Sequence, residues 1–334
     1  MTAFAPDVPA AATAAALFAA EPWRKAVEDA FDVSIRPFVP PSEPDAVGWY
    51  SVLSDLRGER VVSTPFSDFC DPTITTAEGW NEFADYLRSH RRPVTIRPFA
   101  HAIALADTSF ERRGGLVWHG VDLSEGAERV WDGLSSKLRT SIRRAPKAGI
   151  RFRASSTMDD LATFHSLHVE LRRSKYRMLA QPLHLFESLH QRFGDDLVVL
   201  LAEDDDGTPV AGMVYLAWEG VWSYKFSASV PRNGYRPNAA LLMEACRLGA
   251  DRGLRLLDMG RSDTDQPGLV SFKQQFASEE RDLSTLHWTP PGWSDPGAEQ
   301  AGRTLGQLTT LLTDPEVPSR VAVEASRLLY RNFG

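Results

Sequence analysis

A short basic loop at residues 230–237 carries the residue types that bind phosphate. In VPRNGYRP, Arg232 and Arg236 enclose Tyr235 and a glycine, and Asn238 follows where a helix is predicted to begin. Backbone N–H groups point outward at a helix start and the helix dipole adds positive charge, so anions are favoured there. We expect Arg232, Tyr235, Arg236 and Asn238 to contact a phosphate-bearing substrate. The alternative is an ordinary solvated loop, because a helix start with one glycine is a weak signal.

A second group of cations lies on a predicted helix within Leu134–Ile150. Its apolar stripe is Leu134, Leu138, Ile142, Ala145 and Gly149, which leaves Lys137, Arg139, Arg143, Arg144 and Lys147 on the other faces. From Leu134 to Arg177 there are eleven Lys and Arg against three Asp and Glu, a net charge of +8. The remainder of a chain of net charge −7 therefore carries −15. A local basic stripe on an acidic protein favours a small docking site for a polyanion. Arg139, Arg143 and Lys147 are candidate phosphate contacts; the alternative is a solvated connecting helix.

The elements around the basic loop are a strand before it and a helix after it. The strand VWSYKFSAS alternates, which predicts Trp222, Tyr224 and Phe226 on one face and Ser223, Lys225 and Ser227 on the other. It follows a hairpin whose turn is Asp206-Gly207, because glycine tolerates the positive φ of a tight turn. The helix AALLMEACRLGADRG is predicted to have Asn238 as its N-cap and Gly253 as a left-handed C-terminal cap. LRLLDMG then follows as a short buried strand.

The rest of the chain alternates short strands and helices. Strands are predicted in VSIRPFVP, WYSVLSDL, VVSTPF, RPVTIRPF and GLVWHGVDL, and helices at Glu21–Ala30, Thr76–His90, Thr157–Arg172, Leu183–Phe193 and in the C-terminal segments RTLGQLTTLL and PSRVAVEASRLLYRNF. Thr75 or Thr76 is the predicted cap of the helix at Thr76–His90. The Pro- and Gly-rich TPPGWSDPGAE indicates a linker before the C-terminal helices.

Composition and missing motifs limit the class of protein. A chain of 334 residues with 43% hydrophobic residues can form two domains of ordinary size. Cys70 and Cys246 lie far apart in the sequence and have no paired spacing, which fits a reducing compartment. We therefore expect a cytoplasmic protein. The run Ala10–Ala20 has no preceding Lys or Arg and no long aliphatic block, so it predicts a tail or a short helix rather than a signal peptide or membrane span.

Several familiar chemistries lack their sequence motifs. The chain contains no P-loop, dinucleotide-binding, serine-hydrolase or zincin motif. His165 and His168 have a spacing that suits a metal, but no Cys or carboxylate group completes a site, so we expect packed or surface histidines. We therefore predict no metal and no resident cofactor.

Four stretches together resemble the FemABX family, the tandem-lobe relatives of the GNAT N-acetyltransferases. They are VVSTPFSDFCDP, LSSKLRTSIRRAPKAGI, the pair AEDDDGTPVAGMVYL and PNAALLMEACRLGADRGLRLLDMGRS, and GLVSFKQQFA. The resemblance spans roughly residues 50 to 290 in a consistent order. It implies an α/β (α+β) fold of two tandem GNAT-like lobes, each a mixed, mostly antiparallel sheet flanked by helices. We expect a flexible tail at 1–20, a first lobe at 21–130, a second lobe with the donor site at 131–290, and C-terminal helices at 297–334 that pack back on the first lobe.

The resemblance also implies an activity and a site. Members of this family form an amide bond by attack of an amine on an activated acyl ester, and the lysine of their "FK" pair stabilises negative charge at the donor end. In this chain the pair is Phe272 and Lys273, so Lys273 is the expected catalytic residue and Phe272 shapes the pocket. Arg261, in the matching LDMGRS stretch, is expected among the donor-binding residues. The alternative for Lys273 is an exposed helix lysine.

One departure from the family pattern concerns the donor. Lobes that bind acetyl-CoA carry an R/Q-x-x-G-x-G/A loop, whereas Gly234 here has Pro231 before it and Arg236 after it. This departure favours aminoacyl-tRNA, bound by its acceptor-stem end, as the donor. The expected acceptor is an amine of a small molecule or a peptidoglycan precursor. An acyl-CoA N-acyltransferase, with acyl-CoA as co-substrate, and a non-catalytic binding module on the same fold are the alternatives.

Overall fold

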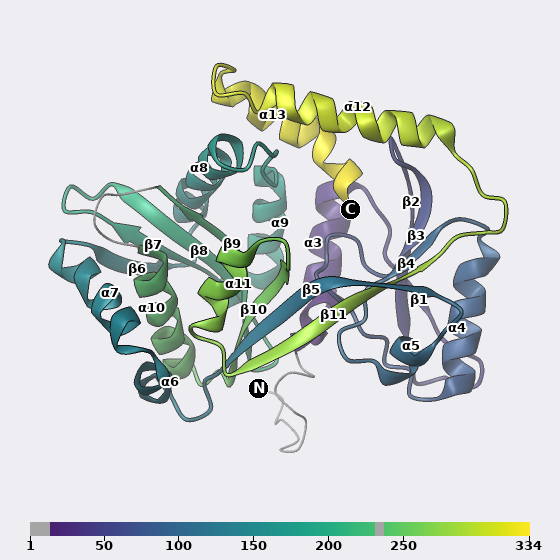
Figure 1. The fold of residues 1–334 in the computed structure, drawn as a ribbon, viewed down its shortest axis with the longest axis horizontal. Helices are drawn as coiled ribbons and strands as arrows, with labels where there is room; N and C mark the ends of the chain where they lie inside the picture. The colour runs from purple at the N-terminus through teal and green to yellow at the C-terminus, as the bar shows by residue number, and fades with distance from the viewer. Residues whose placement is uncertain (1–13, 231–236) are drawn as a thin grey trace. The chain divides into compact units, whose positions relative to one another are not determined.

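The computed structural model describes residues 14–230 and 237–334, which divide into two compact units (Figure 1). The central unit comprises Gly115–His168 and Phe193–Asp282, together with the described residues 14–17. The flanking unit comprises Phe18–Gly114, Val169–Arg192 and Leu283–Gly334. We predicted the boundary between the lobes at residue 130, which lies inside the helix Ala127–Gly133. The two compact units instead change between Gly114 and Gly115.

The central unit contains a mixed sheet in the order β5-β10-β9-β8-β7-β6. Its strands are β5 (Glu111–Asp122), β6 (Arg151–Ser155), β7 (Leu197–Glu203), β8 (Pro209–Trp218), β9 (Val221–Ser229) and β10 (Leu256–Asp263). Its helices are α6 (Ala127–Gly133), α7 (Ser136–Lys147), the first part of α8 (Met158–Ser174), α10 (Pro237–Asp251) and α11 (Pro267–Gln274), with a short turn at Gly194–Asp196. β10 runs parallel to β9, and the neighbouring pairs are antiparallel.

The core of this unit forms because the predicted apolar stripes meet one face of the sheet. Leu138 and Ile142 of α7 and Leu241 and Leu242 of α10 pack against the inward side chains of the strands, such as Tyr215. Each of these side chains is at most 7% exposed, so their burial removes most of their apolar surface from water. The hairpin at Asp206-Gly207 and the helix end at Gly253 are both confirmed, with φ of 77° and 72° at the two glycines.

The predicted common face of the three aromatic residues in β9 is wrong. Tyr215 of β8 is paired with Tyr224, and the next residue, Val214, is paired with Phe226, so Lys225 is the extra residue of a bulge. A bulge reverses the alternation of faces beyond it. Tyr224 accordingly packs with Tyr215, their ring centroids 5.6 Å apart, whereas Phe226 lies 6.0 Å from the ring of His168 in α8.

The flanking unit contains the strands β1 (Arg36–Phe38), β2 (Gly48–Asp55), β3 (Gly58–Val62), β4 (Val94–Ile96) and most of β11 (Glu279–Trp288), paired in that order. Its helices are α3 (Glu21–Phe31), α4 (Ala77–Ser89), α5 (Ala102–Ala106), α9 (Leu183–Phe193), α12 (Pro296–Leu312) and α13 (Ser319–Leu329), with the short helix α2 (Ala16–Ala19) before them and a final turn at Tyr330–Phe333. Trp80 and Phe83 of α4 form its core with residues of β2, β3 and β4.

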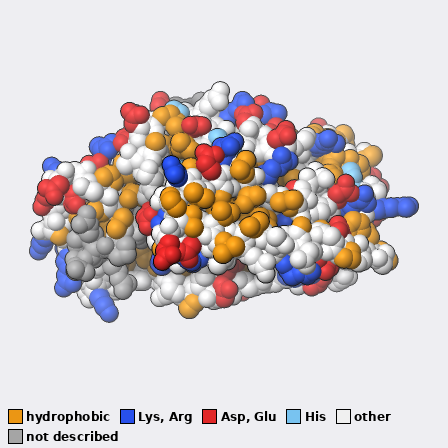
Figure 2. Space-filling view, turned by 90° about the horizontal axis from the view of Figure 1, so that it is seen from above, with side chains coloured by type: hydrophobic (Ala, Val, Ile, Leu, Met, Phe, Trp, Pro, Cys, Tyr) orange, Lys and Arg blue, Asp and Glu red, His pale blue; other side chains and the backbone are white. Residues whose placement is uncertain are grey.

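Residues near both ends of the described chain, from Phe18 onward, pack within the flanking unit. Phe18 is fully buried and packs edge-on against Trp23 and Phe69 at 4.9 and 5.3 Å, so residues 14–20 are not a flexible tail as we predicted for 1–20. At the other end, Asn332 accepts a hydrogen bond from the backbone N–H of Leu56 at 3.1 Å. Helices α12 and α13 expose large hydrophobic side chains, among them Leu311 and Leu328. Hydrophobic side chains also gather near the middle of the face shown in Figure 2. In the described chain, no helix has the length and apolar character needed to cross a membrane.

Candidate functional site

Strands β9 and β10 of the central unit are paired along only part of their length and then separate. β9 and β10 pair in parallel at Val221–Ser223 and Leu256–Asp258. Beyond that level β9 has its bulge at Lys225, and β10 has another opposite β5, between Asp258 and Arg261. Gly260, inside the second bulge, has φ of 64°, a conformation that suits glycine. Bulges next to each other redirect backbone groups and side chains, which makes this point of separation the candidate site.

Asp258 is the buried carboxylate at this point of separation. Its side chain accepts hydrogen bonds from Trp118 Nε1 at 2.6 Å, from the backbone N–H of Gly260 at 2.8 Å and from Ser223 Oγ at 3.3 Å. The residue is only 2% exposed, and a buried carboxylate needs such donors to offset its lost hydration. Asp258 therefore connects β5, β9 and β10 and holds the amide of Gly260 in the bulge.

Lys273 of α11 lies against the same bulge. Its ammonium donates hydrogen bonds to the backbone carbonyls of Gly260 at 3.0 Å and Arg261 at 3.1 Å. The residue is 4% exposed, so the interpretation of Lys273 as an exposed helix lysine is wrong. Its charge is fixed by the fold beside the point where β9 and β10 separate.

His119 of β5 lies between Trp118 and Gly120, which pair with Arg261 and Asp258 on the two sides of the bulge in β10. The residue is fully buried, and its Nε2 lies 2.9 Å from the carboxylate of Glu280, which is half-exposed. Burial lowers the pKa of His119, the positive charge of Lys273 lowers it further, and Glu280 acts in the opposite direction. The ring is therefore neutral at pH 7 and donates from Nε2 to Glu280. Nδ1 of His119 then has no hydrogen-bond partner among the described residues.

The remaining predicted residues lie in different places. Phe272 is partly buried and packs with the core of the central unit; its ring lies 6.0 Å from that of Phe276. Asn238 is the second residue of α10 rather than its N-cap, and its Nδ2 donates to Ser229 Oγ at the end of β9 at 3.2 Å. Arg232, Tyr235 and Arg236 lie outside the described residues.

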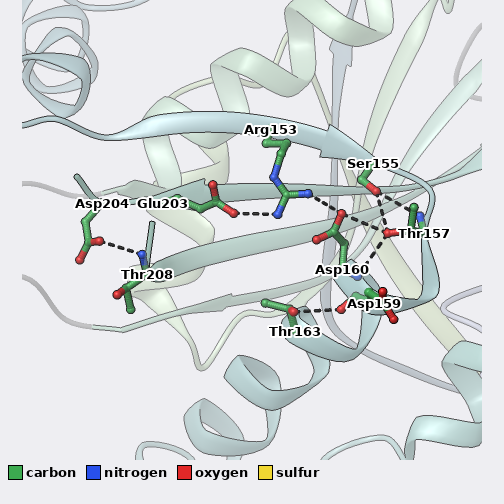
Figure 3. Close-up of polar contacts among 9 residues, drawn as sticks. All are labelled: Arg153, Ser155, Thr157, Asp159, Asp160, Thr163, Glu203, Asp204 and Thr208. Atoms are coloured by element: carbon green, nitrogen blue, oxygen red, sulfur yellow. Dashed lines mark hydrogen bonds and ion pairs between the residues drawn. The ribbon is translucent and has the colours of Figure 1, made fainter. Parts of the chain in front are cut away.

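The predicted basic stretch is not one continuous exposed surface. Arg153 forms ion pairs with Asp160 and Glu203, and Thr157 caps α8 beside it (Figure 3). In the flanking unit, Arg173 is buried and donates to the backbone carbonyl of Val317 at 2.8 Å, and Arg177 pairs with Asp314. The guanidinium groups of these arginines are already engaged by carboxylates and backbone carbonyls of their own unit.

The cations of α7 differ from these arginines. Lys137, Arg143, Arg144 and Lys147 are exposed and Arg139 is partly exposed. Over residues 14–230 and 237–334, none of the five forms an ion pair with a carboxylate, and none of the predicted trio Arg139, Arg143 and Lys147 contacts Lys273. The available positive charge of the stretch is therefore concentrated on α7.

Asp258, Trp118, Ser223, His119 and Glu280 were not among the predicted site residues. A lone acid in LRLLDMG and a lone histidine in GLVWHGVDL are the only local signals for two of them. A polar residue inside an otherwise apolar strand indicates a buried polar group, but its partners come from distant segments and cannot be read from spacing.

The comparisons with known proteins identify a GNAT domain in this part of the chain. Residues 134–274 match the family described as acetyltransferase (GNAT) domain, a range that includes α7, the separating strands and Lys273. The structure of FemX matches with a TM-score of 0.63 at 13% sequence identity, over 80% of this chain and 91% of that chain. L-PGS from Bacillus licheniformis matches with 0.55 at 17% identity, over 84% and 90%.

Residues 134–274 thus form a GNAT-type domain, and the described chain has the fold of these solved structures. A tandem GNAT protein from the clavulanic acid biosynthesis pathway also matches it, with a TM-score of 0.50 at 13% identity, over 79% of this chain and 85% of that chain. No curated protein matches the sequence significantly. The predicted fold class of tandem GNAT lobes is confirmed. The domain match supports a GNAT-type acyltransferase.

Proposed function

We propose that this protein transfers an aminoacyl group from aminoacyl-tRNA to an amine, of either a peptidoglycan precursor or a small natural product. In this reaction the amine nitrogen attacks the ester carbonyl, the new C–N bond forms, and the C–O bond to the ribose breaks. The ribose oxygen leaves as a hydroxyl after it takes up the proton that the amine loses. No metal or resident cofactor is needed for this step, and the proposed location is the cytoplasm.

The observation that carries the proposal is the charge distribution on α7. Its five cations have no carboxylate partners in the described chain, although Arg153 and Arg177 of the same stretch do. Unpaired cations on one helix of an acidic protein form a local site for a polyanion such as RNA. The sequence of the loop at 230–237 supports the same donor, because it lacks the glycines of acetyl-CoA-binding loops.

Lys273 is the residue we propose for the chemical step. A positive charge held in place by two carbonyls costs little reorganisation when negative charge develops on the reacting ester oxygen. Fixed donors and charges of this kind supply much of the rate enhancement in acyl transfer, while alignment of the two substrates supplies another large part. The bulge at Gly260, held by Asp258, determines where this charge lies.

The experiment is a transfer assay with a pool of isotopically labelled aminoacyl-tRNA and an extract that contains candidate amines. Label should move from RNA to an amide product, ribonuclease should abolish the transfer, and added acetyl-CoA should not change it. Full turnover with acetyl-CoA in the absence of RNA would overturn the proposal. Acceptor binding without turnover with either donor would instead indicate a non-catalytic module.

An acyl-CoA donor is the second candidate, favoured by the separation of β9 and β10. An extended chain such as pantetheine can pair with the backbone of β9 where β10 no longer does. Mass-spectrometric detection of copurified CoA would favour this alternative.

A further inference from the structure

Trp131 of α6 lies beneath two arginine side chains that come from two other helices. The guanidinium carbon of Arg143, in α7, is 4.9 Å from the centroid of the indole, and that of Arg247, in α10, is 6.0 Å from it. Trp131 is partly exposed, and its inner part packs against the core of the central unit. All three residues therefore belong to the unit that carries Lys273.

The two arginines differ in how they are held. Arg247 forms an ion pair with Glu244 on its own helix at 3.1 Å, so its charge already has a carboxylate partner. Arg143 has no carboxylate partner in the part of the chain that the structure describes, and its neighbours Lys147 and Arg144 are exposed as well. Arg143 can therefore turn to a phosphate while the indole remains in place.

A partly exposed indole among unpaired cations is the combination that recognises unpaired nucleotides. Proteins bind single-stranded RNA by stacking a base on an aromatic ring or on a guanidinium plane while neighbouring cations contact the phosphates. Bases inside a duplex are already stacked on each other, so they cannot stack on a single exposed indole. The cations alone would bind the phosphates of single-stranded and duplex RNA alike. The indole adds affinity for unpaired bases only, so it favours single-stranded RNA.

We propose that Trp131, Arg143 and Arg247 form a binding site for an unpaired RNA nucleotide, whose base stacks on the indole while Arg143 contacts the adjoining phosphate. This inference rests on the proposed function, because a tRNA has unpaired nucleotides at the 3′ end that carries the aminoacyl group. It goes beyond that function by naming the residue that reads a base rather than the backbone.

The test compares the binding of two fluorescent RNAs by anisotropy over a series of salt concentrations. One is a single strand of about a dozen nucleotides, a length typical of single-strand binding sites, and the other is the same sequence as a duplex. Trp131→Leu should weaken binding of the single strand by about ten- to a hundredfold, the loss expected for one stacked base. The salt dependence of this binding should stay as in the parent protein, because every cation that meets a phosphate is still present.

Two further variants make the result specific. Trp131→Phe keeps an aromatic face and should recover part of the lost affinity, which also shows that the site folds. Trp293→Leu is the matched control, since Trp293 in the flanking unit is also partly exposed and has an arginine, Arg92, at 5.5 Å from its ring. This control should bind both RNAs as the parent does, and all variants should have the circular dichroism of the parent.

Each outcome decides between the proposals. Parent-like binding of the single strand by Trp131→Leu overturns the base-stacking site and leaves the proposed donor intact. Equal weakening for single strand and duplex also overturns it, because it assigns Trp131 to the packing of α6. A parent protein that binds neither RNA contradicts the proposed function itself.

Discussion

The ammonium of Lys273 lies 3.0 Å from the backbone carbonyl of Gly260, and the backbone N–H of Gly260 lies 2.8 Å from the carboxylate of Asp258. One bulge thus connects a buried cation to a buried carboxylate through a single glycine. The residues on both sides of this connection are at most 4% exposed. The geometry of the bulge therefore determines the position of the charge that we assign to the chemical step.

The first prediction concerns Lys273. If its charge stabilises negative charge that develops only in the transition state, Lys273→Ala should lower kcat by about ten- to a thousandfold and leave donor affinity within a few fold. Lys273→Arg should restore activity only in part, because a planar guanidinium cannot occupy the position of a compact ammonium. Steady-state kinetics at saturating donor provide the measurement. Unchanged kcat with weakened donor binding would assign Lys273 to a donor phosphate instead.

The second prediction concerns Asp258. Trp118 Nε1 and the backbone N–H of Gly260 both donate to Oδ1 of Asp258, so Asp258→Asn keeps an acceptor there but removes the negative charge that strengthens both hydrogen bonds. Hydrogen bonds to charged groups contribute about 1.5–3 kcal/mol each, so the free energy of unfolding should fall by roughly 2–3 kcal/mol. Ser223→Ala, which removes only the 3.3 Å hydrogen bond, is the control and should cost about 1 kcal/mol or less. Urea titration would refute the assigned role if the two variants were equally stable.

The third prediction concerns pH and His119. Its pKa is lowered in the folded protein, whereas an unfolded histidine titrates near 6.5. As pH falls below about 6.5, the unfolded state binds more protons than the folded state, so stability decreases until the folded ring is protonated too. His119→Gln should therefore flatten the decline of the free energy of unfolding below about pH 6.5. Identical pH dependence of the parent and His119→Gln would contradict the buried neutral ring.

The fourth prediction concerns α7. Changing Arg139, Arg143 and Lys147 together to Gln should raise the donor KM and reduce the salt dependence of donor binding, by about 0.7–0.9 in the logarithmic slope for each phosphate that a cation no longer neutralises. Arg153→Gln is the matched control, because Arg153 is exposed but engaged with Asp160 and Glu203. The control should lose stability and keep the salt slope of the parent. A triple variant with the parent's slope would assign α7 to solvation.

The sequence predicted local features better than long-range ones. Leu183–Phe193 is a helix with the predicted bounds, and Thr76 caps α4 through the hydrogen bond that its side chain accepts from Gly79 N. Both follow from periodicity and from residues three or four positions apart. The position of Phe226 was mispredicted because one extra residue in β9 reverses the faces, and no local signal distinguishes a bulge at Lys225 from regular alternation.

The site shows the same limit. Lys273 was predicted from a family motif, but its carbonyl partners depend on a bulge in strand β10. Asp258 and Trp118 are 140 residues apart in the chain and meet only because β5 pairs with β10. A contact of this kind depends on the register of the two strands, which spacing within one strand does not specify.

The identity of the donor is the central claim, and one competition experiment tests it most directly. The protein receives aminoacyl-tRNA and acetyl-CoA together, each with a different stable isotope in its acyl group, and an extract of amines; mass spectrometry then identifies the isotope in the amide product. We predict that the product carries the isotope of the aminoacyl group, and that Lys273→Ala forms far less of it. A product that carries the isotope of the acetyl group would contradict the proposed donor.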